Sequence, residues 1–404
     1  MNMKILPKKS IDGHFSVPGD KSISHRALIL GAINKGKLHI NNFLMGDDCL
    51  ATAMCLMQMG IEIEINKNDV VVNGRGLHGF SAPKDVLYAG NSGTTLRLLT
   101  GLLAGQNFNS IIDGDDSLRQ RPMDRVILPL TQMGANIDGN FAPIKIFGTK
   151  LRGIHYKMPI NSAQVKSAIM LAGLYADGET AVEELGCNLI RNHTEIMIDY
   201  LKSGGSTIYV PGDFSSAAFL IAAGLLLADE GLMIKDVGVN STRTGLLDAL
   251  SQMGADINLL NKRNISGEDI ADIYVKKSRL QGIALQANIV PRMIDEVPIF
   301  AVLSLFAEGK TIIRNAAELK IKESNRIETM TTELKKLGAN IAATNDGMEI
   351  YGGFPLHGAE LYSHADHRVA MSLAIAALAS RGPSLIKNAA CVDISFPGFF
   401  DKIL

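Results

Sequence analysis

The stretch Val17-Pro18-Gly19-Asp20-Lys21-Ser22-Ile23-Ser24-His25-Arg26 runs directly into the apolar segment 27–33. The Pro-Gly dipeptide ends an extended segment, and Asp20 or Ser22 can cap the helix that follows. The first turn of that helix then presents the cations Lys21 and Arg26 beside serine hydroxyls. Because a helix N-terminus has free backbone N–H groups and the positive end of the helix dipole, this stretch predicts an anion-binding pocket.

The composition of the 404-residue chain is typical of an α/β protein. Hydrophobic residues make up 47% and charged residues 20%, with 39 Gly and no Trp. A chain of this length exceeds one ordinary core, so we expect two domains. The net charge of −1 gives no general attraction for nucleic acids or anionic membranes, and we expect neither as a partner. Any affinity for anions must therefore come from local clusters of cations.

The cysteines and the N-terminal residues predict a cytoplasmic protein. The cysteines lack the CxxC spacing and fit a reducing compartment; they are Cys49, Cys55, Cys187 and Cys391. The first residues contain no apolar signal core, and no apolar run reaches bilayer length without a charge or glycine. Because no extra apolar surface element is visible, we also expect a monomer.

Three sequence marks recur in phase along the chain. The first is a glycine followed by a short strand, at Gly36, Gly105, Gly178, Gly231, Gly309 and Gly382. The second is a glycine that ends a helix in the left-handed conformation before a strand begins, at Gly60, Gly134, Gly204, Gly254 and Gly338. The third is a helix too apolar to lie at the surface, in segments 27–33, 96–104, 168–175, 217–228, 299–307 and 369–379. Together they predict six copies of one unit: a buried helix, a strand, a loop, an amphipathic helix and further strands.

The six units divide into two halves. The sequence Val17-Pro18-Gly19-Asp20 recurs as Val210-Pro211-Gly212-Asp213, an offset of 193 residues. Each copy closes a strand and opens a buried helix, so we interpret the two copies as the crossings between two domains. The first domain is predicted to span 19–211 and the second 212–404 together with 1–18. A solenoid is the alternative, but repeats near 70 residues with unequal loops fit closed domains better.

Charged and polar residues gather at two recurrent positions of the unit. The openings of the buried helices carry Lys21, Ser22, Arg26, Asn91, Ser92, Gly93, Thr94, Arg97, Ser162, Gln164, Lys166, Asp213, Ser215, Ser216, Asp295, Glu296, Asp366, His367 and Arg368. The loops after the glycine-strands carry Asp47, Asp48, Arg119, Arg121, Arg125, Arg191, His193, Arg243, Lys322, Glu323 and Arg326. If the units are equivalent, two facing domains bring these groups into one cleft. Guanidinium groups bind carboxylate and phosphate well, and carboxylates among them, such as Asp295 and Glu323, suit proton transfer.

Other functional motifs are absent or incomplete. The segment 31–37 imitates a phosphate-binding P-loop, but Leu38 replaces the required hydroxyl. His364 and His367 have metal-like spacing without a further ligand cluster, and Arg368 beside them favours an anion site. A Gly-x-Ser-x-Gly elbow does not occur. We therefore expect no metal and no organic cofactor.

Seven motifs, in order along the whole chain, resemble the 5-enolpyruvylshikimate-3-phosphate synthase family. They are Gly19–Arg26, Asn91–Arg97, Arg121–Met123, Ser162–Ala168, Arg191–Glu195, Lys322–Arg326 and Asp366–Arg368. The segments Ser162–Lys166, Arg191–Glu195 and Asn240–Arg243 look like the class II branch of that family.

The resemblance implies the enolpyruvyl transferase fold, an α/β fold with two domains of three βαβαββ units each, described as an inside-out α/β barrel. The domains would close over the substrates. The implied reaction transfers the enolpyruvyl group of phosphoenolpyruvate to the 5-hydroxyl of shikimate 3-phosphate and releases phosphate, in the shikimate pathway to chorismate and aromatic amino acids.

The resemblance also assigns residues by position. Shikimate 3-phosphate would contact Lys21, Ser22, Arg26, Ser162, Ala163, Gln164, Arg191, Asp295 and Lys322. Phosphoenolpyruvate would contact Lys21, Gly93, Arg121, Gln164, Arg326 and Arg368. The catalytic groups would be Lys21, Asp295 and Glu323: Glu323 or Lys21 as the acid that protonates the methylene carbon, and Asp295 as the base for the attacking hydroxyl.

The sequence differs from the class I pattern of this family at a few positions, and two other functions are alternatives to this interpretation. Leu98 and Ala163 stand where class I often has Pro and Ser, and Ile394–Pro397 lacks a lysine that class I has there. UDP-N-acetylglucosamine enolpyruvyl transferases share the fold but usually carry a cysteine near the Arg-Pro segment, and segment 113–122 has none. A non-catalytic scaffold would present apolar loop surfaces instead of paired charges.

Overall fold

The computed structural model describes residues 1–186 and 190–404, so Cys187 lies outside the described residues. The chain forms two compact units. The first unit consists of Gly19–Val210 and Ile265–Glu268; the second consists of Met1–Pro18, Pro211–Asn264 and Asp269–Leu404. The division predicted from the sequence differs at Pro211 and at 265–268, which it placed in the opposite domains.

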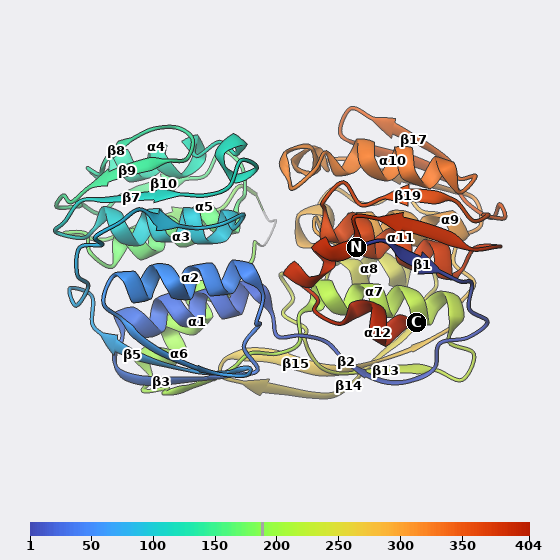
Figure 1. Cartoon of the computed structure of the whole chain (residues 1–404), viewed down its shortest axis with the longest axis horizontal. Helices are drawn as coiled ribbons and strands as arrows, with labels where there is room; N and C mark the ends of the chain where they lie inside the picture. Colours follow the sequence, from blue (N-terminus) through green and yellow to red (C-terminus); the bar gives the residue numbers. More distant parts are fainter. Residues whose placement is uncertain (187–189) are drawn as a thin grey trace. The chain divides into compact units, whose positions relative to one another are not determined.

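The first unit alternates helices with three sheets in its described part. Its helices are α1 (Lys21–Ile33), α2 (Asp47–Gln58), α3 (Gly93–Ala104), η1 (Leu118–Gln120), α4 (Asp124–Gln132), α5 (Ala163–Gly173) and α6 (His193–Lys202). Its strands are β3 (Lys35–Asn41), β4 (Glu62–Asn66), β5 (Asp69–Arg75), β6 (Leu87–Tyr88), β7 (Ser110–Asp113), β8 (Asn136–Asp138), β9 (Ile144–Phe147), β10 (His155–Lys157), β11 (Ala181–Glu183) and β12 (Thr207–Tyr209). They pair in the orders β12-β3-β5-β4, β6-β7-β9-β8 and β10-β11. Helix α1 packs on β3 and β5 (Figure 1).

The second unit repeats this plan. Its helices are α7 (Phe214–Leu227), α8 (Gly245–Gln252), η2 (Val290–Arg292), α9 (Val297–Phe306), η3 (Ala317–Ile321), α10 (Arg326–Lys336), α11 (His367–Leu378), η4 (Ala389–Ile394) and α12 (Phe399–Ile403). Its strands are β1 (Met3–Ile5), β2 (Gly13–Ser16), β13 (Leu232–Gly238), β14 (Asp256–Ile265), β15 (Glu268–Lys276), β16 (Lys310–Ile313), β17 (Asn340–Thr344), β18 (Gly347–Tyr351), β19 (Glu360–Tyr362) and β20 (Ser384–Lys387). They pair in the orders β14-β15-β13-β2, β16-β18-β17 and β1-β20-β19.

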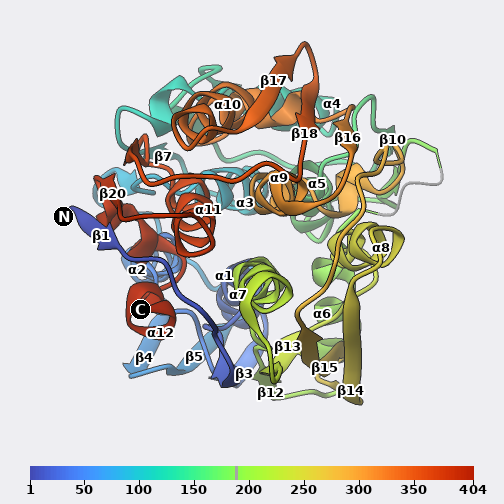
Figure 2. The ribbon, with the colours of Figure 1, turned by 90° about the vertical axis from the view of Figure 1, so that its right-hand side faces the viewer.

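The apolar helices form the cores, as the sequence predicted. In the second unit α7, α9 and α11 pack against one another, and Figure 2 shows them end-on with the strands outside them. Almost every residue of these three helices is buried. In the first unit α3 packs on α5 and α1 packs on α3. A helix that is apolar on all sides is stable only when other elements shield it from water, and here the sheets shield these helices.

The predicted helix ends are confirmed at the second glycine mark. Gly60, Gly134, Gly204, Gly254 and Gly338 all have φ between 83° and 96°. Of the first mark, Gly105 is the exception, with φ −93°. There a Cβ atom would lie 2.5 Å from the Tyr175 side chain, so close packing, not a left-handed turn, requires glycine.

The two Val-Pro-Gly-Asp segments have similar surroundings in their own units. A Cβ atom on Gly19 would lie 2.0 Å from the backbone oxygen of Asn42, and one on Gly212 would lie 2.7 Å from the side chain of Val17. Asp20 caps α1 and Asp213 caps α7 through their side chains. At both glycines, neighbouring atoms therefore leave no room for a side chain, and a buried helix begins directly after each segment. No helix in the described part of the chain is long and apolar enough to cross a membrane.

Candidate active site

The buried helices of the first unit begin at side-chain caps. Asp20 Oδ1 accepts a hydrogen bond from the Ile23 N–H at 2.9 Å, and Ser92 Oγ accepts one from Thr95 at 3.1 Å. Ser162 caps α5 in the same way. Asp20, not the alternative Ser22, is the cap of α1. The caps fix the first turns of α1, α3 and α5, which carry the predicted site residues.

Lys21 and Asp48 form an ion pair at the start of α1. The Lys21 Nζ donates to Asp48 Oδ2 at 3.1 Å, and both side chains are largely buried. Asp48 lies in the first turn of α2, and its backbone oxygen accepts from the Thr95 hydroxyl of α3 at 3.2 Å. The Lys21 ammonium group is therefore held by Asp48, whose backbone is in turn bonded to helix α3.

Guanidinium groups surround Gly93 at the start of α3. A Cβ atom on Gly93 would lie 2.7 Å from Arg97 Nη1 and 3.3 Å from Arg121 Nη1. Arg97 donates to Gln164 Oε1 at 3.0 Å, and Gln164 Nε2 donates to Thr94 Oγ1 at 2.9 Å. These bonds tie α5 to α3 beside the two arginines.

Arg121 is anchored at one end only. Its Nη2 donates to Asn91 Oδ1 at 2.6 Å, while its buried Nε has no hydrogen-bond partner among the described residues. We call Lys21, Asp48, Gly93, Arg97, Arg121 and Gln164 the first cluster.

Arg26 is a buried cross-link instead of an exposed cation. Its Nε donates to Thr194 Oγ1 and its Nη2 to Ser167 Oγ, both at 2.7 Å, and its Nη1 donates to the Ser22 oxygen at 3.0 Å. It is 4% exposed. The side chain therefore joins α1 to α5 and α6, and its bond to Ser22 is to the backbone oxygen of that residue.

Lys166 on α5 forms ion pairs with Glu184 and Glu195 close in sequence to three predicted substrate contacts. Ser162, Ala163 and Arg191 are half-buried, and Arg191 precedes α6 by two residues. Burial alone would lower the pKa of Lys166, but its hydrogen bonds with Glu184 and Glu195 outweigh burial and raise that pKa. Glu184 also accepts from the Ile190 N–H at 3.1 Å. This ion-paired group lies beside Ser162 and the segment that leads to Arg191.

A buried chain of hydroxyl groups supports the first cluster. His25 Nδ1 lies 2.7 Å from Thr52 Oγ1, which lies 2.7 Å from Thr95 Oγ1. The Thr95 Oγ1 also lies 2.7 Å from Ser92 Oγ. Burial lowers the pKa of His25 to about 3. The imidazole is therefore neutral at physiological pH and serves as a hydrogen-bonding group.

In the second unit three cations surround Asp295. Lys322 Nζ and Arg326 Nη1 each lie 3.5 Å from Asp295 Oδ1, and Arg368 Nη2 lies 4.0 Å from Oδ2. Arg368 Nη1 also donates to the Asp295 backbone oxygen at 3.1 Å. The sequence predicted each of these four residues, and the structure brings them together.

Arg326 is the buried centre of this group. Its Nε donates to Asp366 Oδ2 at 2.8 Å and its Nη2 to Glu323 Oε2 at 2.6 Å, and it is 1% exposed. Burial opposes its charge, but Asp366 and Glu323 outweigh burial and raise its pKa. Burial likewise raises and Arg326 lowers the pKa of Asp366, with a net lowering. We call Asp295, Lys322, Glu323, Arg326, Asp366 and Arg368 the second cluster.

Three members of the two clusters were expected at the charged positions of the repeat but were assigned no substrate contact and no catalytic role. Asp48, Arg97 and Asp366 are partners of predicted residues, and all lie at helix openings or in loops after glycine-strands. Their position in the repeat was the available signal. The pairings themselves join residues 27, 67 and 40 positions apart, which no local pattern identifies.

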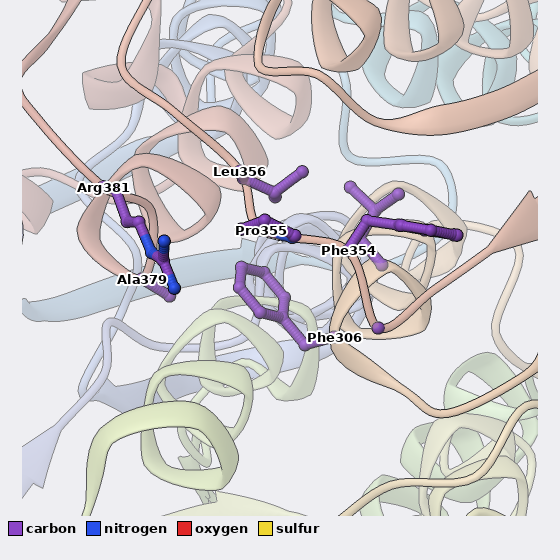
Figure 3. Close-up of a pocket in the computed structure, with 8 residues that line it drawn as sticks. Phe306, Phe354, Pro355, Leu356, Ala379 and Arg381 are labelled. Carbon is purple, nitrogen blue, oxygen red and sulfur yellow. The ribbon is translucent and has the colours of Figure 1, made fainter.

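The described residues hold no group of metal ligands, and the apolar hollow among them shares no residue with the two clusters. Within residues 1–186 and 190–404, no three or more His, Cys, Asp or Glu side chains form a group that could hold a metal ion. His364 pairs with Glu333 at 3.0 Å. A hollow of about 340 Å³ in the second unit is lined by mainly apolar residues such as Phe306, Phe354 and Leu356, with Arg381 at its edge (Figure 3). It contains no member of either cluster.

The repeated sheet-covered helices define an enolpyruvyl transferase fold. The enolpyruvyl transferase NikO from Streptomyces tendae has the same fold, with a TM-score of 0.76 over 99% of this chain and 95% of that one, although only 18% of residues are identical. EPSP synthase from Acinetobacter baumannii is more similar, with a TM-score of 0.88 and 42% identity over 99% of this chain and 97% of that one.

Sequence comparison specifies the family. Residues 5–203 and 201–403 each match the EPSP synthase (3-phosphoshikimate 1-carboxyvinyltransferase) family. The 3-phosphoshikimate 1-carboxyvinyltransferases of Thermoanaerobacter sp. and Alkaliphilus metalliredigens are 50% and 47% identical, over 99% and 98% of this chain and 99% and 97% of theirs. The chain therefore belongs to the EPSP synthase family, and its activity is that of a 3-phosphoshikimate 1-carboxyvinyltransferase.

Proposed function

We propose that the two clusters bind the two substrates of this transfer. The reaction moves the enolpyruvyl group of phosphoenolpyruvate to the 5-hydroxyl of shikimate 3-phosphate and releases phosphate, a step of the shikimate pathway towards aromatic amino acids. Shikimate 3-phosphate is assigned to Lys21, Ser22, Arg26, Ser162, Ala163, Gln164, Arg191, Asp295 and Lys322. Phosphoenolpyruvate is assigned to Lys21, Gly93, Arg121, Gln164, Arg326 and Arg368.

The observation that carries this assignment is a pair of buried arginine N–H groups that form no hydrogen bond within the described residues. Arg121 Nε and Arg326 Nη1 are buried and form no hydrogen bond in the described parts of the chain, although Arg326 Nη1 lies 3.5 Å from the Asp295 carboxylate. Such donors are rare in proteins because burying them unpaired costs free energy. Both belong to residues assigned to phosphoenolpyruvate, whose phosphate and carboxylate oxygens are suitable acceptors.

The remaining groups suit the proton transfers. Asp295 lies among three cations and is the base that removes the proton from the 5-hydroxyl as the oxygen attacks the enolpyruvyl carbon. Glu323 or Lys21 gives a proton to the methylene carbon. Attack and protonation together produce a tetrahedral intermediate. That intermediate then loses a proton from the methyl group and releases phosphate, which restores the enol ether. The cations stabilise the anionic charge throughout.

The finer identity follows from the motifs. Class II membership is supported by the segments Ser162–Lys166, Arg191–Glu195 and Asn240–Arg243. A cytoplasmic location is supported by the cysteine spacing, and a monomer by the lack of an extra apolar surface element. Sedimentation at micromolar concentration checks the last assignment, and a dimer would contradict it.

The decisive experiment measures phosphate release from phosphoenolpyruvate with shikimate 3-phosphate present and then absent. We expect phosphate release only when shikimate 3-phosphate is present. Release with UDP-N-acetylglucosamine and not with shikimate 3-phosphate would favour the nucleotide-sugar transferase. No release with either compound would favour a non-catalytic scaffold. Asp295→Asn is then expected to lower kcat by about 100-fold or more, as loss of a general base does. Asp401→Asn, at an exposed carboxylate in the C-terminal helix, is the matched control.

A further inference from the structure

A buried chain of polar contacts in the second unit ends at Arg368. It begins at Arg243, whose Nη2 donates to Ser215 Oγ at 2.8 Å. Ser215 Oγ donates to Glu296 Oε1, and that oxygen lies 4.0 Å from Arg368 Nη1. The four residues are 3%, 3%, 1% and 8% exposed. The chain thus joins the loop before α8 to the first turns of α7 and α11 and to the N-cap residue of α9.

The hydrogens in this chain have one possible arrangement. A guanidinium group has only donors, so the Ser215 oxygen must accept from Arg243. The single hydroxyl hydrogen of Ser215 is then directed to Glu296, which accepts it. Arg243 is itself held by Asp213, the cap of α7, at 3.5 Å. The Glu296 carboxylate is therefore held by the Ser215 hydroxyl, which Arg243 in turn orients, and neither residue belongs to the second cluster.

Glu296 and the residue before it hold the Arg368 guanidinium from one side. Arg368 Nη1 donates to the Asp295 backbone oxygen at 3.1 Å and lies 4.0 Å from the Glu296 carboxylate. A buried arginine with two such neighbours has little rotational freedom, which favours a defined geometry for an anionic ligand on its other nitrogens.

We infer that Ser215 and Glu296, supported by Arg243, are positioning residues that orient Arg368 for phosphoenolpyruvate. This inference rests on the proposed assignment of Arg368 to that substrate. None of the three residues is assigned a substrate contact; each acts through the next residue in the chain. Their loss is therefore expected to weaken phosphoenolpyruvate binding more than binding of shikimate 3-phosphate.

The test compares Ser215→Ala and Glu296→Gln with Ser216→Ala. Ser216 is the next residue of α7 and is equally buried, but no contact joins it to Glu296 in the described structure. We expect Ser215→Ala and Glu296→Gln to raise the KM for phosphoenolpyruvate about tenfold, the effect of a weakened hydrogen bond to a charged group. The KM for shikimate 3-phosphate should change less than about twofold, and Ser216→Ala should resemble the parent protein. Arg243→Lys retains a donor to Ser215 and should rescue binding relative to Arg243→Met.

The Arg368→Ala variant separates two kinds of failure. If it raises the KM for phosphoenolpyruvate while Ser215→Ala behaves like Ser216→Ala, the positioning role is overturned and the assignment of Arg368 stands. If it leaves that KM unchanged, the assignment of Arg368 fails and the inference falls with it. If Ser215→Ala and Glu296→Gln raise both KM values equally while lowering the midpoint of thermal unfolding, the contacts serve stability alone and the inference is also wrong.

Discussion

Arginine residues with similar sequence surroundings have different tasks in the folded chain. Arg26 and Arg121 both lie at helix openings or loops that the repeat marks as site positions. Arg26 has three nitrogens bonded to Ser22, Ser167 and Thr194, whereas Arg121 keeps a buried N–H without an acceptor among the described residues. The sequence could predict that both gather with the other charged groups. It could not predict which of the two forms three hydrogen bonds within the protein, because two of the Arg26 acceptors lie 141 and 168 residues away.

Gly93→Ala should weaken phosphoenolpyruvate binding without harming the fold. The added methyl group would lie 2.7 Å from Arg97 Nη1 and 3.3 Å from Arg121 Nη1, so both flexible guanidinium groups must move. We expect the KM for phosphoenolpyruvate to rise about tenfold, as for one weakened charge-assisted hydrogen bond. Steady-state kinetics with each substrate varied in turn checks this, and an equal rise in both KM values would contradict it. The midpoint of thermal unfolding should not fall, since alanine favours a helix more than glycine does.

His25→Gln should remove part of the acid sensitivity of the protein. Burial lowers the folded-state pKa of His25 to about 3, below its unfolded value of 6.5. Between these values the unfolded chain binds a proton that the folded chain does not, so stability is full above pH 6.5 and falls as the pH decreases. The loss is on the order of 1.4 kcal/mol for each pH unit below 6.5.

Thermal unfolding at pH 7 and pH 5 measures this contribution. Between pH 7 and pH 5, the midpoint temperature of thermal unfolding should fall further in the parent protein than in His25→Gln. His14→Gln, at an exposed histidine, is the control and should retain the parental dependence. An identical pH dependence in the parent and His25→Gln would show that the buried imidazole is protonated in the folded state after all.

The helices show why the sequence locates elements better than it locates their ends. The apolar segments 27–33, 96–104 and 168–175 mark the buried middles of α1, α3 and α5. The helices themselves begin at residues 21, 93 and 163, three to six positions earlier. Their first turns are polar because they carry the candidate site, and hydrophobicity therefore does not mark them. The caps Asp20, Ser92 and Ser162 mark those starts, so cap chemistry is the better guide to the site-bearing turns.

Gly101→Ala should destabilise the packing of α3 on α5. A Cβ atom at Gly101 would lie 2.3 Å from the Ala168 backbone oxygen, and a helix backbone cannot yield as a guanidinium can. We expect a cost of about 1–3 kcal/mol, seen as a lower midpoint of thermal unfolding, with KM values changed little in the folded fraction. Gly93→Ala is the internal comparison, because it makes the same substitution eight residues earlier in the same helix. Equal midpoints for the two variants would contradict the expected close approach of α3 and α5.

The architecture of the whole chain could be predicted from its internal repeats, except for contacts that the repeats do not share. The six buried helices and the recurring Val-Pro-Gly-Asp segment predicted a two-part α/β fold, and the enolpyruvyl transferase fold is confirmed. Residues 265–268 are grouped with the first unit although the strands β14 and β15 around them lie mainly in the second. There His193 Nδ1 and Glu268 Oε1 lie 2.6 Å apart, both buried. No repeat predicts that contact, because it joins the start of α6 to the start of β15, 75 residues apart.

The proposal that both clusters serve one reaction can be tested with one residue from each unit. Arg121 and Arg368 are both assigned to phosphoenolpyruvate, and each single replacement by alanine is expected to lower kcat/KM for that substrate by about 100-fold, the loss of a good charge-assisted hydrogen bond. If the two guanidinium groups bind the same molecule, the double variant should lose less than the product of the single effects, because the first loss already displaces the ligand from the second group. Arg121→Ala combined with Arg279→Ala, which changes an arginine of the second unit outside both clusters, is the control and should show no such coupling. Strictly multiplicative effects of Arg121→Ala and Arg368→Ala would mean that the two arginines act on separate ligands or steps, and the assignment of both to phosphoenolpyruvate would be wrong.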